Sequence, residues 1–200
     1  PLNGILGYTQ ILRRDAALND KQRAGVGIIH QSAEHLLALI DDVLDLAKIE
    51  ARKLELHPSE FALPEFGQNV AEFFAPRARE KDLRLETSFA ADLPASVVAD
   101  AQRLRQVLFN LLSNAVKFTL RGGVVFSIER AGPAVRFSVS DSGPGIAPAD
   151  QARLFEPFAQ LGDHGQRLGG TGLGLHVSRS ILEQIGSQLQ VESRPGWGTR

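Results

Sequence analysis

The chain has 200 residues, of which 43% are hydrophobic and 22% charged, as in ordinary folded domains. Its 22 basic and 23 acidic residues leave a net charge of −1, which excludes a basic field for non-specific nucleic-acid binding. The lack of cysteine excludes disulfides and thiolate metal sites. No apolar run approaches the roughly 18 residues of a membrane-spanning helix, and no signal peptide is recognisable.

The first 57 residues have the pattern of two helices. Apolar residues recur at helical spacing over 2–14, a polar connection covers 15–20, and a long helix is predicted from there to about Leu54. Apolar positions of the long helix alternate in steps of three and four, which is a heptad seam: Val26, Ile29, Ala33, Leu36, Ile40, Val43 and Ala47. Leu37 and Leu44 widen this seam toward a four-helix-bundle face. Either a second chain completes that bundle, or the hairpin packs on the following domain.

A mixed region follows the boundary at 57–60. The expected elements are a helix over 61–78 interrupted at Pro64 and Pro76, a strand over 83–89, and a helix over 100–117 with Asp100 as N-cap. Two strands over 124–129 and 134–140 form a hairpin, and a short helix over 148–155, a polar loop over 161–170, a further helix and a last strand over 189–192 follow. This order predicts an α+β domain with helices on one face of a mostly antiparallel sheet.

A polar stripe runs along the helix predicted over 100–117. Its members recur at helical spacing beside the apolar face: Arg103, Gln106, Asn110, Asn114 and Lys117. Asparagine is a poor residue in the middle of a helix. An amide oxygen suits Mg²⁺ and a lysine suits phosphate, but the same stripe is also typical of a solvated helix face.

Asp141 ends the second strand of the predicted hairpin. It has the parity of Val135, Phe137 and Val139, so its carboxylate should point to the apolar side of the strand. A buried carboxylate must find hydrogen-bond donors. Either the following turn, Ser142-Gly143-Pro144-Gly145, supplies them, or a ligand does.

Four glycines and a threonine occupy 169–174, directly before an amphipathic run that predicts a helix. A glycine-rich loop that leads into a helix N-terminus suits phosphate. No lysine follows a glycine here as a P-loop requires, and no strand precedes the loop as a dinucleotide-binding turn requires. The five histidines show no metal-ligand spacing, and His30 and His35 lie off the heptad seam, where we expect them to be exposed.

Together these segments resemble the sensor histidine kinases of two-component systems. Residues 1–5 look like the end of the H-box, and 1–57 are similar to the dimerisation and phosphotransfer hairpin. Residues 110–118 look like the N-box, 141–146 like the G1 box, 155–158 like the F-box, 169–175 like the G2 box, and 196–199 like the last glycine turn. The resemblance implies a second domain over 58–200, an α/β sandwich of the gyrase-like ATPase type.

The resemblance also implies the residues that bind ATP and Mg²⁺. Asn114 would ligate the metal, Lys117 would pair with phosphate oxygens, and Asp141 would accept a hydrogen bond from the adenine amino group. Residues 161–170 would form a lid from which Arg167 reaches toward phosphate. The remaining implied nucleotide contacts are Asn110, Phe118, Gly143, Gly145, Ile146, Phe158, Gly170, Thr171, Gly172, Leu173 and Gly174. Asn110 and Lys117 would be the catalytic pair.

The implied activity is transfer of the γ-phosphate of ATP to a histidine, with relay to a response regulator. Related hydrolytic ATPases have a water-activating glutamate where this chain has Asn110, which cannot act as a base. Alternatives are a degenerate kinase that acts as a dimeric scaffold, and a hydrolytic ATPase or serine kinase of the same fold.

The resemblance places the acceptor histidine five residues before Pro1, outside the chain. The chain has no methionine, so we expect a piece of a longer protein. The implied partners are a second copy, bound through 1–57, and a receiver domain. The implied location is a cytoplasmic domain whose parent can be anchored in the inner membrane.

Overall fold

The computed structural model describes residues 1–15, 17–51, 53–159 and 171–200. It divides into two compact units, Pro1–Leu54 and Glu55–Arg200. The lid expected at 161–170, with Arg167 and Gly170, lies outside the described residues. Among the described residues, no helix combines the length and apolar character that a bilayer crossing needs.

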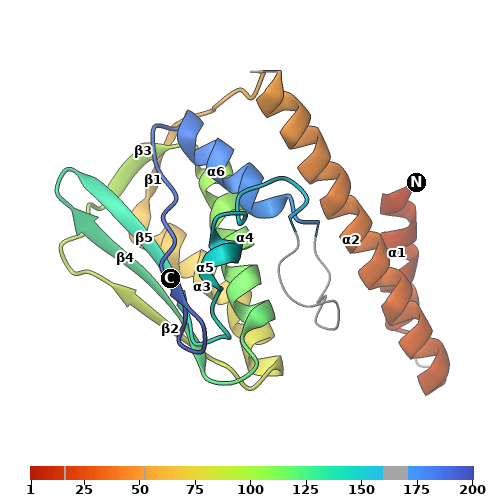
Figure 1. Ribbon diagram of the computed structural model, residues 1–200. Helices are drawn as coiled ribbons and strands as arrows, with labels where there is room; N and C mark the ends of the chain where they lie inside the picture. Colours follow the sequence, from red (N-terminus) through yellow and green to blue (C-terminus); the bar gives the residue numbers. More distant parts are fainter. Residues whose placement is uncertain (16, 52, 160–170) are drawn as a thin grey trace. The chain divides into compact units, whose positions relative to one another are not determined.

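The first unit is a hairpin of two helices, α1 (Leu2–Arg13) and α2 (Asp20–Glu50), which lie side by side (Figure 1). A capping box starts α2: Asn19 Oδ1 accepts from Gln22 N at 2.9 Å, and Gln22 Oε1 accepts from Asn19 N at 3.0 Å. Thr9 Oγ1 and His30 Nδ1 lie 2.8 Å apart and connect the helices. His35 is exposed as predicted, but the prediction for His30 is wrong, because this contact leaves its side chain only 16% exposed.

The predicted seam of α2 stays largely uncovered in the single chain. Ile29, Leu36, Ile40 and Val43 are each at least 41% exposed, and Leu44 beside them is 52% exposed. A long run of exposed apolar side chains on one helix marks an interaction surface. The hairpin therefore carries a face that its own two helices do not bury.

The second unit is built on a five-stranded sheet in the order β2-β4-β5-β7-β6. These strands are β2 (Arg84–Phe89), β4 (Gly123–Ala131), β5 (Ala134–Asp141), β6 (Ser193–Arg194) and β7 (Gly198–Thr199). β2 pairs with β4 in parallel, and every other pair in this sheet is antiparallel. The predicted hairpin and mostly antiparallel sheet are confirmed.

Three longer helices accompany the sheet: α3 (Leu63–Glu80), α4 (Ala101–Phe118) and α6 (Gly174–Gln184). Figure 1 shows them on one side of the sheet, as the sequence predicts. The core between α3, α4 and β4 is formed by side chains that are at most 2% exposed: Leu63, Val70, Phe74, Leu108, Leu112, Val124, Phe126 and Ile128. Alternation along β4 buries one face and leaves Val125 on the other.

Five details of the predicted elements differ from the structure. Residues 61–62 belong to a strand, β1 (Ser59–Ala62), which pairs with β3 (Ser96–Ala99). Neither proline interrupts α3. Pro64 lies in its first turn, where a missing N–H costs nothing, and the helix continues through Pro76. α2 ends at Glu50 instead of Leu54, and α5 (Pro148–Gln151) is shorter than predicted. No strand spans 189–192; the last described strands are β6 and β7.

Candidate functional site

Helix α4, which carries the polar stripe, begins at Asp100 as predicted. Asp100 Oδ1 accepts from Arg103 N at 3.0 Å, and its Oδ2 accepts from His57 N at 2.9 Å. Burial opposes ionisation of this carboxyl, but its hydrogen bonds from backbone N–H groups outweigh burial and hold its pKa below the ordinary value. The carboxylate thereby fixes the start of α4 and ties the incoming chain to it.

The stripe is not a solvated face, because its five residues are all half-buried. Helix α6 packs on α4, and Asn110 Nδ2 donates to Ser178 Oγ of α6 at 2.9 Å. Asn114 Nδ2 is 3.4 Å from Asn110 Oδ1, a long hydrogen bond. Asn114 Oδ1 has no hydrogen-bond partner among the described residues. The two amides thus form a chain that ends in an oxygen available to a ligand.

The first turn of α6 lies directly against Asn110. A β-carbon on Gly174 would overlap Asn110 Oδ1 and fall 2.9 Å from its Cγ. The glycine therefore lets α6 approach α4 closely enough for the bond between Asn110 and Ser178. Leu173, the N-cap residue of α6, makes no side-chain cap hydrogen bond, and the first N–H groups of a helix are suited to an anion.

Thr171, Gly172 and Leu173 lead into α6 in different ways. Thr171 Oγ1 accepts from Leu173 N at 3.0 Å, and the Leu173 side chain is fully buried. The Leu173 side chain is thus a core contact. Gly172 lies against the backbone of Phe158, where an added β-carbon would be 2.6 Å from the Phe158 carbonyl carbon. The loop before α6 and the segment after α5 therefore meet.

Asp141 lies at the end of β5, and its carboxylate is partly satisfied by the turn that follows. Its Oδ1 accepts from Gly143 N at 2.8 Å. Burial raises the pKa of Asp141 above its ordinary value, and hydrogen bonds from the N–H groups of Gly143 and Thr199 offset only part of that rise. Beyond it, Gly145 adopts φ +70° against the Arg194 backbone, and Ile146 N donates to Ser193 Oγ at 2.8 Å. The turn thus supplies one donor to the half-buried carboxylate of Asp141, and β7 supplies the other.

Lys117 and Phe118 end α4. Lys117 Nζ is 4.8 Å from the centre of the Phe118 ring, which is 40% exposed. Burial, and secondarily the charge of Lys81, lowers the pKa of Lys117 below its ordinary value. A β-carbon on Gly143 would be 3.4 Å from the Phe118 carbonyl oxygen, so the turn after β5 meets this end of α4. Phe158, by contrast, is 64% exposed with φ +62°.

The structure thus gathers most of the expected residues along α4. The turn after β5 meets its C-terminal end, and the first turn of α6 meets its middle. No cluster of three histidine, cysteine or acidic side chains that could hold a metal occurs in the described ranges. Sequence reasoning missed Ser178 and Lys81; for Ser178 the available signal was its position four residues after Gly174, on the same helix face.

Family models match both units. Residues 99–200 match the histidine kinase-, DNA gyrase B- and HSP90-like ATPase family, and residues 1–52 match the His Kinase A (phospho-acceptor) domain. The chain therefore belongs to the histidine kinase family.

Curated relatives match over the whole chain, and three of them serve as examples. It is 40% identical to the sensor histidine kinase GacS of Pseudomonas protegens, 39% to the autoinducer 2 sensor kinase/phosphatase LuxQ of Vibrio cholerae, and 41% to the circadian input-output histidine kinase CikA of Synechococcus elongatus. The chain spans only 22%, 24% and 27% of these relatives, respectively.

Solved structures of histidine kinases share the fold. Full-length ShkA in complex with AMPPNP superposes with a TM-score of 0.80 at 38% identity, over all of this chain and 41% of ShkA. ThkA in complex with the response regulator protein TrrA gives a TM-score of 0.68 at 26% identity, over 99% of this chain and 55% of the other. The predicted α/β sandwich is confirmed.

Proposed function

We propose that the chain is the core of an ATP-dependent protein-histidine kinase that binds Mg·ATP along α4. The observation that carries this proposal is the convergence of the turn after β5, the amide pair of α4 and the first turn of α6. Each of these offers chemistry that a different part of a nucleotide needs. The AMPPNP complex of ShkA, a protein of the same fold, supports this reading.

Asp141 is the proposed adenine contact. Its carboxylate is half-buried at the end of β5, and within the described part of the chain two backbone N–H groups, those of Gly143 and Thr199, donate to it. A carboxylate accepts up to four hydrogen bonds, so the exocyclic amine of adenine can add one. Gly143, Gly145 and Ile146 supply the turn beside it, and Phe118 and Phe158 offer exposed rings as walls of the pocket.

The phosphates would lie toward Asn114, Lys117 and the start of α6. The Asn114 Oδ1 atom suits Mg²⁺, which prefers oxygen ligands and commonly takes few of them from protein alongside phosphates and water. When bound, Mg²⁺ supplies charge neutralisation at the phosphate oxygens. Lys117 would pair with those oxygens, and Thr171, Gly172 and Gly174 would place N–H groups near them. Arg167 and Gly170 of the lid stay part of the proposal.

Asn110 favours transfer over hydrolysis. Its amide donates to Ser178, so it is held in place and has no basic group with which to activate water. A neutral histidine ring nitrogen is already a nucleophile and needs less activation. We therefore assign transfer to a histidine, with Asn110 and Lys117 orienting the reacting phosphate.

The exposed seam of α2 supports a homodimer through residues 1–57. A second copy would cover Ile29, Leu36, Ile40 and Val43 and complete a four-helix bundle. The complex of ThkA with TrrA supports a response regulator as the partner that receives phosphate.

The test is calorimetric titration of the chain with Mg·ATP, comparing wild type with Asp141→Ala. We expect binding by the wild type and none measurable by the variant, with an unchanged circular dichroism spectrum. Addition of an acceptor hairpin in trans should then yield acid-labile phosphate. Wild-type affinity in Asp141→Ala would contradict the adenine assignment, and absence of binding by the wild type would favour a degenerate scaffold.

A further inference from the structure

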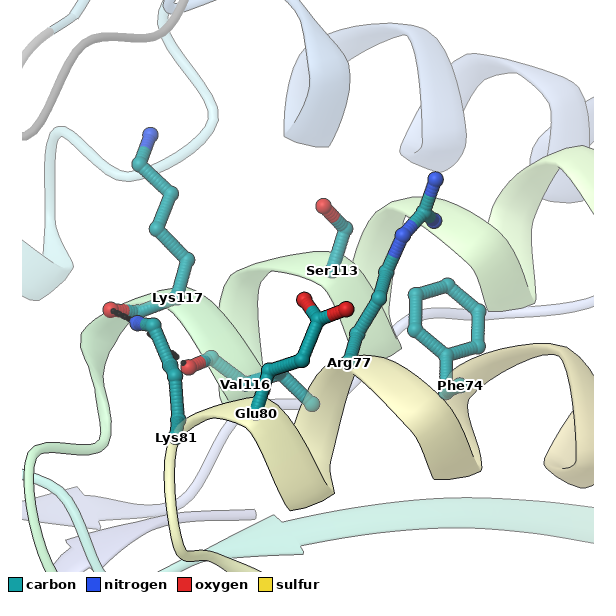
Figure 2. Close-up of a pocket in the computed structure, with 7 residues that line it drawn as sticks. All are labelled: Phe74, Arg77, Glu80, Lys81, Ser113, Val116 and Lys117. Carbon is teal, nitrogen blue, oxygen red and sulfur yellow. Dashed lines mark hydrogen bonds between the residues drawn. The ribbon is translucent and has the colours of Figure 1, made fainter. Parts of the chain in front are cut away.

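Lys81 follows α3, yet its side chain binds the end of a different helix. Its Nζ donates to the carbonyl oxygens of Val116 at 3.0 Å and Lys117 at 2.8 Å (Figure 2). The last four carbonyl groups of a helix have no partner within it. At this end of α4, the carbonyl oxygen of Ala115 accepts a hydrogen bond from Thr119 N. Lys81 therefore provides charge-assisted hydrogen bonds for two more of these four carbonyl groups. It does so at the helix end where the helix dipole favours a positive charge.

The same end of α4 is held from other directions. Thr119 is fully buried, and its Oγ1 donates to Ala115 O at 2.7 Å. The Gly143 backbone lies against the Phe118 carbonyl oxygen and Thr119 Oγ1. Lys81 thus completes a clamp around the backbone that carries Lys117 and Phe118.

The position of Lys81 also decides what the Lys117 side chain can do. A lysine in the last turn of a helix can bind the free carbonyls of its own helix. Here Lys81 already binds the carbonyl oxygens of Val116 and Lys117. Figure 2 shows the Lys117 side chain extending away from Lys81. Both lysines line a hollow of about 360 Å³ between α3 and α4, together with Phe74, Arg77, Glu80, Ser113 and Val116.

We propose that Lys81 is a positioning residue for the nucleotide phosphates: it anchors the end of α4 and keeps the Lys117 ammonium directed outward to meet them. The inference rests on the proposed function, in which Lys117 pairs with phosphate oxygens. The Lys81 ammonium is engaged by the carbonyl oxygens of Val116 and Lys117, so in this proposal its effect on the nucleotide passes through Lys117.

The test is a double-mutant cycle on Mg·ATP affinity, measured by calorimetry on the full chain. Lys81→Met removes the ammonium but keeps most of the side-chain volume, and it should weaken ATP binding about fivefold. In a Lys117→Ala background, the same change should lower Mg·ATP affinity by less than about twofold. Lys81→Arg, which keeps the charge and the donors, should restore most of the affinity. The matched control is Arg79→Met, which removes a positive charge from an exposed side chain two residues away.

Thermal unfolding of every variant separates loss of fold from loss of binding, and Lys81→Gln replaces Lys81→Met if the latter does not fold. An equal loss in both backgrounds, or no loss at all, would overturn the inference. So would a loss in Arg79→Met as large as that in Lys81→Met. Unchanged affinity in Lys117→Ala alone would instead refute the phosphate contact of the proposed function.

Discussion

Replacement of Gly174 by alanine should weaken nucleotide binding through its neighbour Asn110. The added methyl carbon would lie 2.9 Å from Asn110 Cγ and 3.1 Å from Nδ2, whereas ordinary contacts begin at 3.4 Å. Because Asn110 Oδ1 would be nearer still, Asn110 or helix α6 must shift by about an ångström. Asn110 cannot swing aside freely, because its Nδ2 is bound to Ser178 of the same helix α6 at 2.9 Å.

The energetic cost follows from two opposing effects. Overpacking costs about 1–3 kcal/mol, and alanine recovers roughly 0.5–1 kcal/mol relative to glycine within a helix. We therefore expect the free energy of unfolding of Gly174→Ala to fall by about 1–2 kcal/mol. ATP affinity should fall about tenfold or more, because displacement of a positioned group by about an ångström is costly at a binding and reacting centre.

Urea denaturation and calorimetric titration check both numbers. In an Asn110→Ala background the amide that the methyl meets is gone, so Gly174→Ala should no longer destabilise the protein. Gly4→Ala is the matched control, because a β-carbon there has no neighbour within 4 Å; it should leave ATP affinity unchanged. The reasoning is refuted if Gly174→Ala matches the wild type in both measurements, or if it costs as much stability without Asn110 as with it.

Two other outcomes follow from α4. Asn110→Glu should raise phosphate release from ATP, because a carboxylate can activate water. Asn110→Gln, whose side chain is as long as that of glutamate but has no basic group, should not raise it. Equal rates of phosphate release in the two variants would contradict the proposal. Asp100→Ala should cost about 1 kcal/mol of stability at neutral pH through loss of the N-cap. Because the folded-state pKa of Asp100 lies below the ordinary 3.8, its contribution is present above pH 3.8 and is lost as the pH falls through the folded-state value. The difference in free energy of unfolding from the wild type should shrink in acid, and a constant difference would count against the cap.

Local patterns were enough for much of the fold. The spacing of apolar residues predicted α1, α4 and the hairpin of β4 and β5, and Asp100 was recognisable as a cap because capping depends on the residues that follow it directly. β1 was missed because its pairing partner, β3, lies more than thirty residues away, with Phe61 opposite Val97. A short apolar run looks alike in a helix and in a strand until such a partner is known.

The sequence by itself determined the order of the elements and the residue types offered to a ligand, because both depend on local periodicity and on motif spacing. Only the tertiary structure decided which of those residues meet. Asn110 and Ser178 are 68 positions apart, Lys81 reaches a carbonyl 36 positions away, and Asp141 is bound through Thr199 near the chain's end. The first two contacts arise from the packing of α6 and α3 on α4, and the third from the pairing of β7 with β5. No local pattern encodes either arrangement.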